Sequence, residues 1–261
     1  MLAFIRGARS LLSVVLVGLS FIPGSLVFRL LILPTVWLFP KLRFRLVSLF
    51  MHGISWVIVT LLSLGGARFR RVGALPTASP VLVVGNHQAL LDICQIALMS
   101  QPRVPAFVAR RRYARFVPLV SACIRLLGCP IVDPKRDPAG SVEAIRRGAS
   151  DLPHGLIIFP EGHRSRDGEI RPFRTTGLET ILQTRPMPVY LVLSDGLWRG
   201  GRFADLLFRV HLIDAVTEAM GPFEPPTEPE ELHGFVLGLR QKLVARLAER
   251  RQQACPPAPH P

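Results

Sequence analysis

The stretch VLVVGNHQALLD at residues 81–92 decides the fold of this chain. Its four leading apolar residues and a glycine predict a short strand buried inside a parallel sheet. Asn86, His87 and Asp92 follow directly, and residues 90–99 have the spacing of a helix. Open α/β sheets bind their ligands beyond the carboxyl ends of the strands. The stretch therefore predicts a strand that delivers polar side chains to the ligand-binding edge of an α/β sheet.

A second stretch, LIIFPEGHRSRDG at residues 156–168, has the same design, because residues 155–159 predict another buried strand. The residues after it are charged or allow close backbone approach: Glu161, Gly162, His163, Arg164 and Arg166. Arginine side chains match the oxygens of phosphate, and glycine lets a ligand approach the main chain. A solvated charged loop is the alternative, but the position after a buried strand favours a site for an anionic group. We expect the two strand ends to form one shared site.

His87 and Asp92 are the residue types of a general base and the carboxylate that orients it. On a regular helix, positions five apart lie about 140° apart, so the pair requires His87 in the turn before the helix. Asp92 can then accept a hydrogen bond from one imidazole nitrogen, which leaves the other free to take a proton from a hydroxyl. Such a pair is part of a Ser-His-Asp triad, with a substrate hydroxyl in place of the serine. Simple capping of the helix is the alternative, and the absence of a GxSxG motif argues against a conventional serine hydrolase.

Strand and helix patterns alternate along the chain, which is typical of an α/β sheet. We expect further strands at residues 104–109, 131–133, 188–193 and 208–213, and further helices at 120–127, 141–152, 177–183 and 232–250. The predicted fold class is α/β, a mixed and largely parallel sheet flanked by helices, with an N-terminal two-helix hairpin. The predicted divisions are an N-terminal membrane-associated segment (1–73), a globular domain (74–221), and a proline-rich linker with an amphipathic helix and a disordered tail (222–261).

Two N-terminal runs, residues 10–28 and 46–66, carry no charge and are long enough to span a bilayer. Basic residues lie before, between and after them: Arg6, Arg9, Lys41, Arg43, Arg45, Arg68, Arg70 and Arg71. If both runs crossed the membrane, the central basic cluster would lie on the opposite side, against the positive-inside tendency. Pro23-Gly24 and Pro34 also interrupt the helix pattern. We therefore expect a helical hairpin embedded in one leaflet. Two full spans and two buried core helices are the alternatives.

Composition limits the classes of molecule that the chain is expected to bind. The 261 residues carry a formal net charge of +14, which suits an anionic lipid surface, a phosphorylated substrate or nucleic acid. No zinc-finger, RNP or KH signature is present, so nucleic acid is not expected. The four cysteines form no CxxC pair, and the seven histidines have no HExxH or HxH spacing. We expect free buried thiols in a reducing compartment and no metal site.

Several motifs resemble those of one family. NHQALLD resembles the NHxxxxD motif of the glycerolipid acyltransferases, and FPEGHRS resembles their FPEGTRS motif. The chain is most similar to the bacterial 1-acylglycerol-3-phosphate acyltransferase family, over roughly residues 75–213. GCPIVDPKR and MPVYLVLSDG are similar to the second and fourth blocks of that family, and FVARRRYARFVPLV to the segment with a basic residue at the position of Arg110. Phe173 and Gly177 resemble its FKxG motif with one extra residue.

The resemblance implies an O-acyltransferase that needs no cofactor, with residues 74–221 as its catalytic domain. His87 would deprotonate the acceptor hydroxyl, oriented by Asp92, for attack on the thioester of acyl-CoA or acyl-carrier protein. The acceptor would be lysophosphatidic acid and the product phosphatidic acid, made at the cytoplasmic face of a bacterial inner membrane. The residues implied in substrate binding are Asn86, Arg110, Lys135, Arg136, Glu161, Gly162, His163 and Arg164.

Two departures from the family pattern concern the acceptor. His163 stands where the family has threonine. Pro134 stands where its second block has arginine, so Lys135 or Arg136 must take over that contact. Both changes leave the thioester chemistry intact. The alternatives are another lyso-lipid acceptor, such as lyso-ornithine lipid, and a membrane-surface binding protein that keeps the fold without turnover.

Overall fold

The computed structural model describes residues 2–76, 80–100, 103–116, 118–201 and 203–254. Its centre is a six-stranded sheet. From one edge to the other, the strands are β1 (Arg68–Val72), β8 (Asp214–Phe223), β7 (Val189–Asp195), β2 (Val81–Gly85), β6 (Gly155–Ile158) and β3 (Ala106–Phe107). A second, two-stranded sheet pairs β4 (Ala109–Arg110) with β5 (Ile131–Val132) in parallel.

The strand directions bring the two polar segments to one edge of the large sheet. β7, β2, β6 and β3 run parallel, and Val84 of β2 lies opposite Ile158 of β6. β8 runs antiparallel to β7, and β1 runs parallel to β8. Every residue of β2 is buried, as the interior of a sheet covered on both faces requires. β2 and β6 therefore end side by side, and the segments that follow them start from the same edge.

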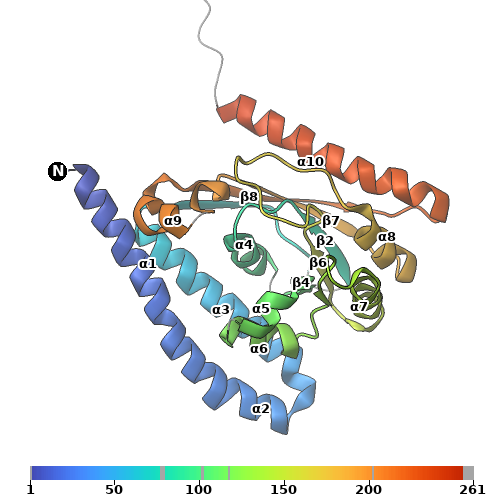
Figure 1. Ribbon diagram of the computed structural model, residues 1–261, viewed down its shortest axis with the longest axis horizontal. Helices are drawn as coiled ribbons and strands as arrows, with labels where there is room; N and C mark the ends of the chain where they lie inside the picture. The colour runs from blue at the N-terminus through green and yellow to red at the C-terminus, as the bar shows by residue number, and fades with distance from the viewer. Residues whose placement is uncertain (1, 77–79, 101–102, 117, 202, 255–261) are drawn as a thin grey trace, which may run out of the picture.

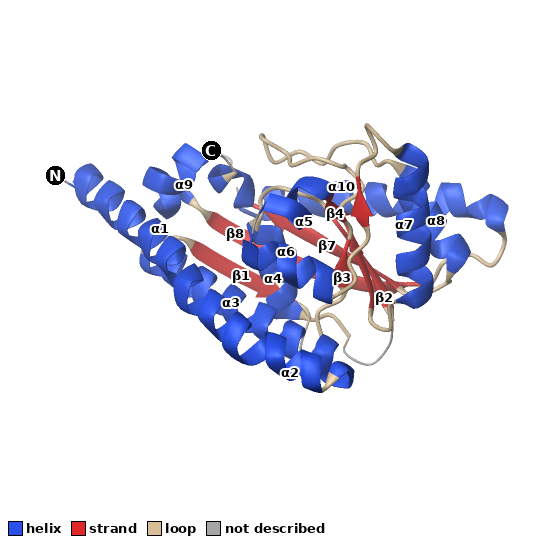
Figure 2. Cartoon of the chain, turned by 60° about the horizontal axis from the view of Figure 1, so that its bottom comes forward, coloured by secondary structure: helices blue, strands red, loops and turns tan. Residues whose placement is uncertain are grey.

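Helices cover both faces of the sheet (Figures 1 and 2). On one face, α10 (Leu232–Ala254) packs on β7 and on α8 (Thr175–Thr184), which also contacts α7 (Pro138–Asp151). On the other face lie α4 (Leu91–Met99), α5 (Arg111–Phe116) and α6 (Pro118–Leu126), in front of the N-terminal hairpin. The short elements near β7 and β8 are η3 (Leu197–Gly200), α9 (Phe203–Arg209), η4 (Val210–Leu212) and η5 (Pro229–Glu231).

The N-terminal segment is a pair of antiparallel helices. α1 (Leu2–Val27) continues through the π-helical turn η1 (Phe28–Ile32) into α2 (Leu33–Leu38). The turn η2 (Pro40–Leu42) then reverses the chain into α3 (Arg43–Leu64). Nε of Arg9 donates a hydrogen bond of 2.6 Å to the carbonyl of Leu64, so the two free ends of the hairpin meet.

The two arms of the hairpin differ in how much they bury. Both Phe4–Leu38 and Pro40–Leu64 are long and apolar enough to cross a membrane, but 11% of the most apolar window is buried in the first and 33% in the second. α3 buries one side along most of its length: Val47, Ser48, Met51, Ser55, Val59 and Leu62. The first arm exposes large apolar side chains instead, with Phe4 80% and Trp37 81% exposed. Exposed large apolar side chains along a helix are typical of a surface that contacts a membrane or another protein.

The predicted fold class is confirmed, since the sheet is mixed, mostly parallel and flanked by helices, beside an N-terminal two-helix hairpin. The helix predicted at 90–99 is α4, and the one predicted at 232–250 is α10. The apolar face of α10 recurs every three or four residues: Leu232, Val236, Leu239, Leu243 and Leu247. The predicted tail, residues 256–261, lies outside the described part of the chain.

Three local predictions were wrong. Residues 208–213, predicted as a strand, form the end of α9 and η4, and the strand starts at Asp214. Pro23 does not end α1, because proline removes one hydrogen bond while the neighbouring turns keep theirs. The run 104–109 divides into the short strands β3 and β4. In addition, the sheet begins at Arg68, before the predicted domain start at residue 74. This first strand, β1, lacks the apolar pattern of a buried strand because it is an exposed, arginine-rich edge strand.

Candidate active site

His87 and Asp92 form a hydrogen-bonded pair at the carboxyl end of β2. Nδ1 of His87 lies 2.8 Å from Oδ2 of Asp92. His87 lies in the loop before α4 and Asp92 in the first turn of that helix, as the spacing required. The side chain of Asp92 is fully buried, whereas 18% of the His87 side chain is exposed. With Nδ1–H bonded to the carboxylate, Nε2 is the nitrogen that can accept a proton.

Asp92 also organises the start of α4. Its Oδ2 accepts hydrogen bonds from the N–H groups of Gln88 at 2.7 Å and Ala89 at 2.8 Å. Both donors lie in the loop before Leu90, the N-cap of α4, which has no side-chain capping hydrogen bond. Within the described residues the other oxygen, Oδ1, makes no hydrogen bond. Asp92 therefore holds both the imidazole and the backbone of the loop before α4, and simple capping of the helix does not describe its contacts.

Glu161 connects the two polar segments. It is 1% exposed. Oε1 accepts from the N–H of His87 and Oε2 from the N–H of Arg171, each at 2.8 Å. Burial raises the pKa of this carboxyl above its usual value, although the two N–H donors favour the charged form. Glu161 thus fixes the backbone of the histidine. Its predicted contact with an acceptor stays a prediction.

The backbone around His87 is held from two further directions. The N–H of Ser165 donates to the carbonyl of His87 at 2.7 Å. Asn86 exchanges two hydrogen bonds with the backbone of Ser194 in β7: Nδ2 donates at 2.8 Å and Oδ1 accepts at 2.7 Å. The Asn86 amide is buried, so its observed contacts belong to the fold. A substrate contact for Asn86 stays a prediction.

The imidazole ring stacks on Phe159, with ring centroids 4.4 Å apart and planes at 21°. Gly85 makes room for the ring of Phe159, because a Cβ at position 85 would lie 3.0 Å from that phenyl ring. The ring of His87 is therefore fixed by a stacking contact on one face and by Asp92 at Nδ1.

The Glu161–Arg166 loop also contacts β4. The guanidinium of Arg110 donates a hydrogen bond to the carbonyl of Gly162. Gly162 has φ +71°, a conformation that favours glycine. The structure thus brings together two residues predicted from separate segments. His163 is exposed and Arg164 half-buried on the same loop.

A basic hollow of about 400 Å³ lies next to Arg110 along the chain. Its lining residues are Arg111, Arg112, Arg115, Asp133 and Arg136. Four guanidinium groups against one carboxylate give the hollow a net positive charge. Arg136 lines it, whereas Lys135, the other predicted replacement for the second-block arginine, is exposed and does not. Arg136 is therefore the better placed of the two to meet an anion.

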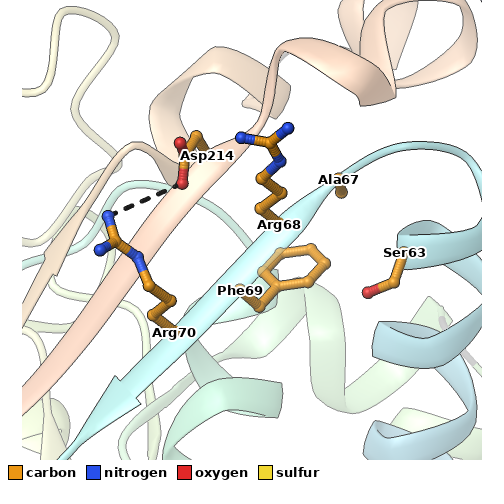
Figure 3. Close-up of a pocket in the computed structure, with 6 residues that line it drawn as sticks. All are labelled: Ser63, Ala67, Arg68, Phe69, Arg70 and Asp214. Carbon is orange, nitrogen blue, oxygen red and sulfur yellow. Dashed lines mark ion pairs between the residues drawn. The ribbon is translucent and has the colours of Figure 1, made fainter.

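A second hollow, of about 610 Å³, lies over the edge strand β1 (Figure 3). It is lined by Ser63, Ala67, Arg68, Phe69, Arg70 and Asp214. Arg70 and Asp214 approach to 4.0 Å there. None of the predicted site residues lines this hollow, so it is separate from the site around His87.

The described cysteines are unpaired thiols. Burial raises the pKa of Cys94 to about 11 and those of Cys123 and Cys129 to about 12. Such thiols remain protonated and unreactive near neutral pH. Cys255 lies outside the described residues. Across the part of the chain that is described, no group of three or more His, Cys, Asp or Glu side chains can hold a metal ion.

The sequence did not identify several residues that position the site. Gln88, which is fully buried, donates to the carbonyl of Gly168 and accepts from the N–H of Trp198, both at 3.3 Å. The N–H of Arg171 holds Glu161. In each contact one partner is a backbone atom, which every residue type supplies, so no sequence signal marks the pairing.

The chain is similar to known acyltransferases over most of the sheet region. The family model described as Acyltransferase matches residues 67–193, and its match begins immediately before β1. The 1-acyl-sn-glycerol-3-phosphate acyltransferase of Helicobacter pylori is 27% identical over 177 residues, which cover 65% of this chain and 72% of that protein. The protein of the same name from Limnanthes douglasii is 25% identical over 170 residues, 63% of this chain and 58% of that one.

Two further comparisons concern the acceptor and the fold. The lyso-ornithine lipid O-acyltransferase of Rhodobacter capsulatus is 28% identical over 163 residues, 56% of this chain and 57% of that one. The crystal structure of the 1-acyl-sn-glycerophosphate acyltransferase from Thermotoga maritima has the same fold, with a TM-score of 0.70 at 22% identity, covering 94% of this chain and 98% of that one. The matches span about half the length of the plant relatives.

The family-model match and these relatives support assignment of this chain to the glycerolipid acyltransferase family, and the structural match supports the fold. Within that family, its relatives include proteins named 1-acyl-sn-glycerol-3-phosphate acyltransferase from bacteria and plants.

Proposed function

We propose that this chain is an O-acyltransferase that moves a fatty acyl chain from acyl-CoA or acyl-carrier protein to the free hydroxyl of 1-acyl-sn-glycerol 3-phosphate. The product is phosphatidic acid. The observation that carries the proposal is the His87–Asp92 pair, with Nδ1 held at 2.8 Å by a buried carboxylate and the ring partly exposed. That arrangement suits a base that takes a proton from a bound hydroxyl.

The proposed transfer has two stages. As the acceptor oxygen attacks the thioester carbonyl, Nε2 of His87 takes the hydroxyl proton, and Asp92 stabilises the imidazolium that forms. The tetrahedral intermediate then collapses, the carbon–sulfur bond breaks, and the imidazolium returns the proton to the departing thiolate. The products are an ester and a free thiol, and the chemistry requires no cofactor.

The acceptor proposal rests on the charge near the site. The basic hollow lined by Arg111, Arg112, Arg115 and Arg136 supports an acceptor with a phosphate headgroup. Arg110 and Arg164 add positive charge to the adjoining loop. A lyso-ornithine lipid acceptor is the second candidate, because one relative of comparable identity has that name. Its headgroup contains no phosphate, so the arginine-rich hollow favours the first candidate.

The membrane proposal rests on the hairpin. α3 packs against the globular domain from Val47 to Leu62. If this helix crossed a bilayer, the domain packed on it would have to enter the lipid. We therefore propose that the hairpin lies in one leaflet, with the exposed side of α1 and α2 in the acyl chains. On this arrangement a membrane-impermeant reagent labels a cysteine placed at Lys41 from the cytoplasmic side. Labelling only from the opposite side would show two spans.

The experiment for the activity is thiol release from acyl-CoA, with lysophosphatidic acid and lyso-ornithine lipid as acceptors. We expect release with the phosphate acceptor, and a loss of about 10²- to 10⁴-fold in His87→Ala. His233→Ala is the matched control, because its exposed ring on α10 pairs with Glu179, outside the site described above.

The outcomes separate the candidates. Release only with lyso-ornithine lipid keeps the base and replaces the acceptor. Equal rates of release for the native protein and His87→Ala would refute the catalytic assignment of His87, whereas no release with any acceptor would favour a membrane-surface binding protein without turnover. Transfer from one donor and not the other decides between acyl-CoA and acyl-carrier protein.

A further inference from the structure

The C-terminal helix α10 holds the loop that follows β6. Nε of Arg240 donates to the carbonyl of Arg171 at 3.0 Å, and Nη2 donates to the carbonyl of Ile170 at 3.1 Å. The fork of one half-buried guanidinium thus fixes two consecutive carbonyls. Near the far end of the helix, Arg251 makes a second attachment, to the carbonyl of Gly168 at 3.2 Å and to Glu169 at 2.6 Å.

The residue that Arg240 holds is part of the active-site network. The N–H of Arg171 donates to Oε2 of Glu161 at 2.8 Å, and Oε1 of Glu161 accepts from the N–H of His87 at 2.8 Å. The path from helix to base therefore contains two side chains, Arg240 and Glu161, and one peptide group. A displacement of the Arg171 peptide removes one of the two donors that keep the Glu161 carboxylate in its buried position.

Other contacts dock α10 without Arg240. Its apolar face is buried against β7 and α8. Arg246 and Arg250 both bind Glu218 of β8, at 2.8 Å and 2.9 Å. Loss of Arg240 should therefore loosen the loop while the helix stays in place. This separation makes a positioning function testable apart from folding.

We propose that Arg240 is a positioning residue for the base: by anchoring the carbonyls of Ile170 and Arg171, it keeps Glu161 on the backbone of His87. The inference rests on the proposed acyl transfer and deepens it, because it extends the working site to a helix far along the chain. The hydrogen bonds of Arg240 go to the loop carbonyls and not to His87, so we expect it to affect the geometry of the reaction and not the binding of the acceptor.

The test compares Arg240→Gln with Arg246→Gln. Glutamine is shorter and cannot bind both carbonyls, whereas Arg246→Gln on the same helix leaves Glu218 paired with Arg250. For Arg240→Gln we expect kcat to fall roughly tenfold or more with a KM for the acceptor within about twofold, because small misplacements of reacting groups cost rate. Arg240→Lys should recover part of the rate, since an ammonium can donate to one carbonyl.

Hydrogen exchange provides a readout that is independent of activity. The amide of Arg171 should exchange faster in Arg240→Gln and at the native rate in Arg246→Gln, with similar melting temperatures for both variants. Native exchange at Arg171, or equal kcat values in the two variants, would overturn the inference. If the native protein transfers acyl groups to no lyso-lipid, the proposed function fails, and the exchange measurement alone still decides whether Arg240 holds the loop.

Discussion

The two segments that meet at the edge of the sheet are built in opposite ways. Segment 86–92 is local: its base, its orienting carboxylate and two further backbone donors all lie within it. Segment 161–171 depends on distant partners, because Glu161 binds the backbone of His87, Arg110 binds Gly162, and Arg240 binds Arg171.

The contrast separates two tasks of one site. The local segment contains the groups that move a proton, and the hydrogen bond that joins them lies within it. The second segment sets where that unit lies relative to the rest of the site and presents basic side chains at the surface. Changes in the first segment should therefore reduce the rate most, and changes in the second should reduce positioning and binding.

The largest expected effect is for Asp92→Asn. An amide nitrogen facing Nδ1 favours the wrong imidazole tautomer, so kcat should fall on the order of 10³-fold in the thiol-release assay. Because the pair acts as one unit, His87→Ala/Asp92→Asn should lose little more than His87→Ala alone. Losses that multiply in the double variant would show that the two residues act independently.

A smaller effect is expected for Glu161→Gln. Glu161 accepts hydrogen bonds from two N–H groups, and the glutamine NH₂ cannot accept from the one that it faces. The backbone of His87 should therefore shift, and kcat should fall about 10- to 100-fold. Glu179→Gln on α8 is the matched control, because that carboxylate pairs with His233 and not with the site. Equal rates for the two variants would mean that the second segment does not position the base.

Glu161 also predicts a dependence of stability on pH. Burial raises its pKa in the folded protein, so the folded state binds this proton more tightly than the unfolded chain. The contribution of Glu161 to the free energy of unfolding therefore falls as the pH rises from the usual glutamate pKa of about 4.3 toward the raised value. Glu161→Gln lacks this titrating carboxyl group, so its free energy of unfolding does not change for this reason. The difference in free energy of unfolding between wild type and variant should therefore narrow over that pH range. Urea unfolding at several pH values measures the gap, and a widening gap would contradict the raised pKa.

The smallest effect is expected for Arg136→Gln, which removes one positive charge from the basic hollow. The KM for lysophosphatidic acid should rise about three- to tenfold, with little change in kcat, because charged hydrogen bonds to phosphate contribute to binding. Lys135→Gln removes the same charge from the neighbouring residue outside the hollow and should change KM less than twofold. Equal increases in both variants would assign the effect to general surface charge.

What the sequence predicts well in this chain is local. The Asn86–Asp92 motif predicts its own geometry, because six residues after a buried strand leave few ways to bring His87 to Asp92. Helices with a periodic apolar face, such as α10, were also predicted. The edge strand β1 was missed because RFRRV has three arginines, two apolar residues and a mostly exposed surface, features that a basic cluster at a lipid surface would share.

The positions that sequence reasoning missed depend on long-range backbone contacts. The bond from Arg171 to Glu161 and those from Arg240 to two carbonyls require the packed positions of β6 and α10. A charged side chain on an amphipathic helix usually points to solvent, so nothing in the sequence distinguishes Arg240 from its neighbours. The backbone of Ser194 binds Asn86 in the same way, and the identity of residue 194 gives no sign of that contact.

The pairing of β1 with β8 has a consequence for the order of assembly. β1 lies just after the hairpin, while its neighbour in the sheet, β8, begins at Asp214 near the other end of the chain. During synthesis from the N-terminus, the hairpin and β1 are complete long before that partner exists, and such distant pairings form late. Until β8 forms, the arginines of β1 keep its unpaired edge soluble and disfavour pairing with other strands. The apolar hairpin thus has time to reach the proposed lipid surface before the sheet beside it closes.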